Sequence, residues 1–349
     1  MHEENPLRTQ VSQEERDLAL KFQSYADAVA AGFTRSSGSF NALRRNALAE
    51  QRAKAVVEEA APQAVALPER SADTEAWYQS VKAYTSQQIA RQDRIRTVEV
   101  TIPGDQWVGI TFVGDIHIGG LIDYDLLEAD LGFIEEVDGL FAVGMGDYGN
   151  FFGSAGKLAH AMAHDTVPDT TDQLDLCTHI LSKCNKWLAV GEGNHDGWAG
   201  SRGIERLAEN LDAQYFSQAG CAFKVSVGSQ RYISYLKHTW RGHSNINTSN
   251  ESRRFWAEFP EWENADFTVL AHFHQPDTHT VEKKGQSVGH LRGGTYKLVD
   301  DYAAKGGYEP VYGPSLVLLN PREHVFLPFH GPHWKYGVKF LQLLRSESK

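Results

Sequence analysis

The stretch VGEGNHDGWAG, residues 190–200, follows a run of apolar residues and turns on glycines where Asn194, His195 and Asp196 stand side by side. Taken alone, this composition is that of a tight turn, because Asn and Asp tolerate left-handed backbone and hydrogen-bond to their own main chain. The interpretation therefore depends on whether other strands of the chain end in the same kind of residue.

Four other strand-like segments end in this way. The apolar runs that predict buried strands are WVGITF (107–112), GLFAVG (139–144), WLAVG (187–191), RYISYL (231–236) and DFTVL (266–270). The residues that follow them, in chain order, are Asp115 and His117, then Asp147, then Asn194 and His195, then His238, and finally His272 and His274. In α/β sheets the loops at the carboxyl ends of strands converge on one crevice, so we expect these side chains to meet.

Helical patterns at 122–139 and 171–186 alternate with the first three of these strands and predict an α/β fold. We expect three regions. Residues 1–60 are predicted to be helical, in the form of a helix-turn-helix that binds DNA or of a solvated helical hairpin. Residues 61–105 are predicted to form a linker with a lead-in helix and strand, and residues 106–349 the main domain.

Carboxylate, imidazole and amide side chains together suit Mn, Fe, Zn or Ni, whereas Mg and Ca prefer oxygen ligands alone. Asp115 and His117 are two residues apart, as are His272 and His274, so each pair can point the same way where its strand ends. One carboxylate can bridge two cations, and the central Asp147 is our candidate. The pattern predicts a site for two divalent metal ions, with Mn favoured.

The ordered set GDIH, GD, GNHD, a lone His and HFH resembles the calcineurin-like metallophosphoesterase superfamily, in a phage or bacterial form, over about residues 106–330. The resemblance implies a four-layer sandwich of two β-sheets flanked by helices. One metal ion would be held by Asp115, His117, Asp147 and His274, and the other by Asp147, Asn194, His238 and His272. His195 would meet the leaving group or a phosphoryl oxygen, with Asp196 orienting its ring.

Two features of the motifs leave questions. Ala271 stands where the family pattern has a glycine before the first His of the fifth motif. The fourth motif offers both His238 and His243, and we favour His238 as the ligand because it ends the apolar strand.

The resemblance implies phosphoester hydrolysis, and the leading hypothesis is a phosphodiesterase or nuclease that attacks DNA through a hydroxide bridging the metals. The helical segment 24–47 supports it, as does the polar loop 241–255, where Arg241 and His243 are candidate substrate-binding residues. The alternatives are a phosphomonoesterase for a phosphoprotein or small metabolite, and a non-catalytic DNA- or protein-binding scaffold.

Composition bears on three properties of the protein: nucleic-acid binding, disulfide content and membrane anchoring. A net charge of -11 over 349 residues disfavours indiscriminate binding of nucleic acid by the whole surface. Three cysteines without a CxxC pair do not indicate a disulfide framework. No apolar run approaches the roughly 20 residues that span a bilayer, and the N-terminus lacks the pattern of a signal peptide. We expect a cytoplasmic protein without a membrane anchor.

Overall fold

The computed structural model describes residues 21, 25–34, 68–94, 96–151, 166–199, 202–244, 247–258, 265–283, 285–299 and 309–347. The chain forms two compact units, Met1–Val81 and Lys82–Lys349. In the first unit the short helix α2 (Tyr25–Ala30) ends before Gly32, which has the left-handed φ of +103° that glycine adopts without strain. The rest of the predicted helix-turn-helix region lies outside the described residues.

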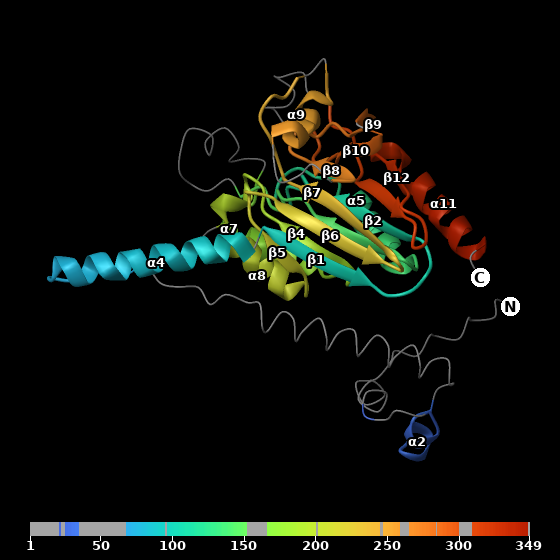
Figure 1. Ribbon diagram of the computed structural model, residues 1–349, viewed down its shortest axis with the longest axis horizontal. Coiled ribbons are helices and arrows are strands. Elements are labelled where there is room, and N and C mark those ends of the chain that lie inside the picture. The colour runs from blue at the N-terminus through green and yellow to red at the C-terminus, as the bar shows by residue number, and fades with distance from the viewer. Residues whose placement is uncertain are drawn as a thin grey trace. The chain divides into compact units, whose positions relative to one another are not determined.

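The second unit is built on two mixed, six-stranded β-sheets (Figure 1). We call them the β1 sheet, with strand order β1-β6-β7-β8-β10-β9, and the β2 sheet, with order β12-β11-β2-β3-β4-β5. The strands of the β1 sheet are β1 (Thr97–Ile102), β6 (Cys221–Val227), β7 (Gln230–Leu236), β8 (Phe267–Leu270), β9 (Asp277–Lys283) and β10 (Gln286–Arg292). Those of the β2 sheet are β2 (Val108–Val113), β3 (Leu140–Gly144), β4 (Trp187–Gly191), β5 (Gln214–Phe216), β11 (Ser315–Leu319) and β12 (Phe326–Phe329).

The two sheets pack face to face through a shared apolar core. Ile110 and Phe112 of β2 meet Phe223 and Phe267 of the β1 sheet there, and all four side chains are buried. The strands of the β2 sheet are apolar on both faces because its other face is also covered, as expected for a sheet with helical crossovers.

Helices complete a four-layer sandwich. The outer face of the β2 sheet packs against α5 (Tyr124–Glu136), α7 (Thr170–Leu181), α8 (Gly203–Asn210) and α11 (Trp334–Glu347). The outer face of the β1 sheet packs against α9 (Asn250–Glu258) through Phe255, Tyr235 and Leu270 (Figure 1). Asp123 and Asp169 cap the first turns of α5 and α7 by accepting backbone N–H bonds. The predicted α/β sandwich of two sheets flanked by helices is confirmed.

Some elements differ from the sequence analysis. β1, which lies in the predicted lead-in segment, pairs in parallel with β6. The β9–β10 hairpin and the C-terminal helix α11 were not anticipated. The long helix α4 (Thr74–Arg94) occupies the place of the predicted lead-in helix. Among the described helices, none is both long enough and apolar enough to cross a bilayer.

We expect Phe267→Ala to lower the free energy of unfolding by about 3–5 kcal/mol, since the ring is fully buried between the sheets and its removal leaves a cavity. Denaturant unfolding measures this. Gly132→Ala is the control: it lies within α5 with open space at the new Cβ, and should raise stability by roughly 0.5–1 kcal/mol. Equal stability of Phe267→Ala and the wild-type protein would contradict the assigned core.

Candidate metal centre

The five predicted strand ends converge on one buried cluster. β2, β3 and β4 run parallel in one sheet, and β7 and β8 run parallel in the other. Among the described residues, three groups have ligand atoms within 4.8 Å of one another: Asp115, His117 and His274; His117, Asp147 and His195; and Asp147, His238 and His272. The sequence analysis named all seven of these residues.

The cluster stands on strained backbone. Eight non-glycine residues in the described part of the chain have positive φ, and five of them are Asp115, His117, Asp147, His272 and His274, with φ between 51° and 76°. Such conformations cost of order 1–3 kcal/mol each and persist only where the surroundings enforce them. Here the N–H groups of Ile116 and His117 both donate to the carbonyl of Asp147, which ties the loop after β2 to the loop after β3.

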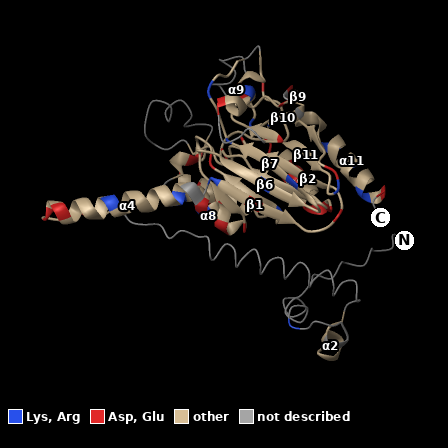
Figure 2. Ribbon diagram, viewed as in Figure 1, with Lys and Arg blue, Asp and Glu red and all other residues tan. Residues whose placement is uncertain are grey.

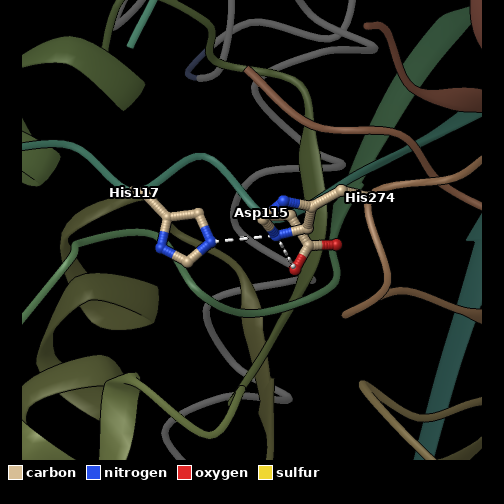
Figure 3. A group of neighbouring side chains, drawn as sticks. All are labelled: Asp115, His117 and His274. Carbon is tan, nitrogen blue, oxygen red and sulfur yellow. Dashed lines mark hydrogen bonds and ion pairs between the residues drawn. The ribbon is translucent and has the colours of Figure 1, made fainter. Parts of the chain in front are cut away.

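The first group brings together residues from the loops after β2 and β8 (Figure 3). His117 Nε2 lies 3.2 Å from His274 Nε2, which in turn lies 3.5 Å from Asp115 Oδ1. Asp115 Oδ2 accepts the backbone N–H of His272, whereas Oδ1 is buried without a hydrogen-bond partner among the described residues. Asp115 therefore presents one oxygen to the cluster.

The other two groups share Asp147. Its Oδ1 accepts the backbone N–H of His195, and its Oδ2 lies 3.2 Å from His238 Nε2. His238 Nε2 is also 2.9 Å from Asn194 Oδ1, while His238 Nδ1 bonds the carbonyl of Met145. Because a carbonyl only accepts, Nδ1 carries the proton and Nε2 faces the cluster, an orientation typical of metal-binding histidines.

These residues fit divalent cations. Two imidazole nitrogens face each other at 3.2 Å beside a buried carboxylate oxygen that has no hydrogen-bond partner in the described part of the chain, an arrangement that a shared cation satisfies. Burial holds the pKa of His117 well below its usual range and lowers the pKa of His272. Neutral imidazoles are the form that binds metals.

Asp147 and His238 form the strongest charge pair of the cluster. Burial opposes charge on His238, but the carboxylates of Asp147 and Asp115 outweigh burial and raise its pKa to about 10. Burial likewise opposes charge on Asp147, and the imidazoles of His238, His195 and His117 nevertheless hold its pKa well below the usual range. The shared Asp147 carboxylate is therefore ionised.

His195 belongs to the group that it forms with His117 and Asp147. Its Nδ1 bonds the carbonyl oxygen of Asn150 at 2.8 Å, and its Nε2 is 4.0 Å from Asp147 Oδ2. Since the carbonyl fixes the proton on Nδ1, Nε2 faces the cluster and can accept a proton there.

The prediction that Asp196 orients this ring is wrong. Its buried carboxylate accepts three backbone N–H bonds instead, at 2.6 Å from Asp147, 3.1 Å from Tyr148 and 2.7 Å from Gly193. Asp196 thus joins the turn after β4 to the turn after β3, and the Asn150 carbonyl does the orienting.

The two candidate substrate-binding residues, Arg241 and His243, have different surroundings. Arg241 pairs with Glu258 of α9, at 2.8 Å, and its side chain is 73% exposed. The ring of His243 stacks on Phe273, between the two histidines of the fifth motif, with centroids 3.5 Å apart. Among the described residues it is His238, and not His243, that belongs to the ligand groups.

Sequence reasoning missed a buried pair beside the cluster. Arg292, at the end of β10, is 1% exposed, and its Nη1 lies 3.7 Å from Oε2 of the fully buried Glu251. Burial lowers the pKa of Arg292 and raises that of Glu251 to about 7. No sequence pattern marked Arg292 as buried, because its strand β10 also carries Gln286, Ser287 and His290.

No protein-family model matches the sequence, and no curated protein matches it significantly. Solved structures with a similar arrangement include zinc-bound Vps29 from Entamoeba histolytica, at 18% identity over 63% of this chain and 89% of that one, with a TM-score of 0.32. The Thermotoga maritima protein TM1076 shares 12% identity over 64% and 97% of the two chains, with a TM-score of 0.30. GAP50 of Plasmodium, described as an anchor in the inner membrane complex, shares 9% over 69% and 95%, with a TM-score of 0.35. Similarity this low supports no functional argument.

We expect Asp196→Asn to lower the free energy of unfolding by about 1–3 kcal/mol, because the amide turns an N–H group toward buried backbone N–H donors. Denaturant unfolding of chelator-treated protein measures this. Asp169→Asn is the control, since Asp169 also accepts two backbone N–H bonds but caps a helix at the surface, where Asn serves equally well. Equal stability of the two variants would show that Asp196 does not hold the turns together.

Proposed function

We propose that the protein is a metal-dependent phosphoester hydrolase of the calcineurin-like metallophosphoesterase type, and that its substrate is a phosphodiester of a nucleic acid. The observation that carries the proposal is the position of Asp147, whose ligand atoms lie close to those of His117 on one side and of His238 and His272 on the other. A carboxylate shared between two sets of imidazoles suits a pair of divalent cations.

Asp115, His117, His274 and Asp147 would hold one cation, and Asp147, Asn194, His238 and His272 the other. Mn is the first candidate, and Fe, Zn or Ni also suit these ligands. When bound, the cations supply Lewis acidity, which activates water and stabilises negative charge on the phosphoryl oxygens.

His195 is proposed to transfer the proton. Its Nδ1 proton is held by Asn150, so Nε2 remains directed at the cluster, where it can donate a proton to the departing oxygen once it is protonated. The ring is largely buried, at 13% side-chain exposure; its Nδ1 bonds the Asn150 carbonyl, and the backbone N–H of His195 donates to Asp147 Oδ1. His195 is thus preorganised for one position of the leaving group.

A diester of nucleic acid is proposed ahead of a small phosphomonoester because the polar loop after β7 reaches the cluster, where His243 stacks on Phe273 and offers a side chain to a phosphate backbone. The charge of the protein limits how the nucleic acid is held. On α9 the adjacent Arg253 and Arg254 are followed by the carboxylate of Glu258, and Figure 2 shows charges of both signs on this helix. We infer recognition through the site rather than through a broad basic face.

The cluster is expected to bind two equivalents of Mn²⁺ after chelator treatment, measured by isothermal titration calorimetry with elemental analysis. His274→Ala should reduce the number to one, because it removes a ligand of only one group. His333→Ala, which changes an exposed histidine outside these groups, is the control and should still bind two. Wild-type protein that binds no Mn²⁺, Zn²⁺, Fe²⁺ or Ni²⁺ would contradict the proposal.

In Mn²⁺ we expect bis-p-nitrophenyl phosphate to be hydrolysed faster than p-nitrophenyl phosphate. His195→Ala should lower kcat by about 10²–10⁴-fold, the usual contribution of a proton-transferring side chain, with two Mn²⁺ still bound. A faster monoester reaction would exclude the diesterase proposal in favour of a phosphomonoesterase. Full activity of His195→Ala would exclude the assigned role of this ring.

A further inference from the structure

Trp198 is an exposed tryptophan beside the proposed proton-transferring histidine. It is 48% exposed, although tryptophan is mostly buried in folded proteins. Its ring centroid lies 4.9 Å from that of His195, which lies 4.7 Å from that of His117 in the cluster. The indole therefore lies next to a ring that itself belongs to one of the ligand groups.

The position of this indole is fixed by the turn that carries it. Trp198 ends the short 3₁₀ helix Asp196–Trp198. The backbone N–H of Trp198 donates to the carbonyl of His195 at 2.9 Å. Asp196 is the first residue of the same helix, and its carboxylate accepts the three backbone N–H bonds already described. The indole is thus presented to solvent by a rigid segment, which lowers the entropy lost when a ligand stacks on it.

Other apolar side chains lie exposed beside the cluster. Leu121, four residues after His117, is 41% exposed, and Leu298 and Val299 are 39% and 49% exposed. The N–H of Leu298 donates to the carbonyl of Leu121, so these two segments lie side by side. Lys297 pairs with Ile122 in an antiparallel bridge, which keeps the two segments together.

We propose that Trp198 is a stacking platform for an unpaired nucleobase of the substrate, and hence that the substrate is single-stranded nucleic acid. This inference rests on the proposed function and names the substrate class of the same site. Bases stack on aromatic side chains with little regard to sequence, since every base offers a π face. In a duplex that face is covered by the neighbouring base pairs, so the base must be unpaired to reach the indole.

The test compares two oligomers of equal length and charge, oligothymidylate and a chain of abasic tetrahydrofuran nucleotides, with wild-type protein, Trp198→Ala and Trp198→Phe in Mn²⁺. Stacking contributes about 1–3 kcal/mol per base, or roughly 5- to 150-fold. The ratio of kcat/KM for oligothymidylate to that for the abasic chain should fall by this factor in Trp198→Ala and mainly be retained in Trp198→Phe. Tyr336→Ala, which removes an exposed aromatic ring on α11, is the control and should keep the wild-type ratio.

An unchanged ratio in Trp198→Ala, with both chains hydrolysed, would overturn the platform and leave the proposed function intact. An equal loss on both chains would also overturn it, because it would assign Trp198 a role in holding the turn. If the wild-type protein hydrolyses neither chain, the proposed function fails. Fluorescence anisotropy of the labelled chains then decides the platform separately: it stands if Trp198→Ala selectively weakens oligothymidylate binding, and falls otherwise.

Discussion

The left-handed backbone at the strand ends is the constraint on which the rest of the structure depends. Asp115, His117, Asp147, His272 and His274 all adopt positive φ, a conformation that costs free energy at each position. The cost is offset by two buried sheets that fix the strands, and by bonds between the loops that follow them. Asp196 makes three of these bonds and so holds two of the turns in place.

Much of the cluster could be predicted from the sequence, because the rule that carboxyl strand ends converge needs only the strands and the residues after them. The sandwich of two sheets was predicted only because the motifs resemble those of a known family. The partners of Asp196 could not be predicted, since they depend on the turn after β3 lying against the turn after β4. The positive φ of residues such as His272 could not be predicted either, because a histidine in a sequence does not indicate left-handed backbone.

Buried charge was the other feature that sequence reasoning missed. Arg292 and Glu251 are residue types that are almost always exposed, so a sequence pattern places them at the surface. Here Glu251 lies on the buried side of α9 and meets Arg292 at the end of β10, close to the fifth-motif loop, whose Gln275 carbonyl accepts a bond from Arg292. Arg241 pairs with Glu258 at the surface, a contact with α9 that the sequence pattern did not predict.

The central claim is that Asp147 lies between two cations. Anomalous diffraction from crystals soaked in Mn²⁺ tests it most directly. The account predicts two peaks about 3.5–4 Å apart on either side of Asp147, one beside Asp115, His117 and His274 and the other beside Asn194, His238 and His272. A single peak away from Asp147, or peaks on other residues only, would contradict it.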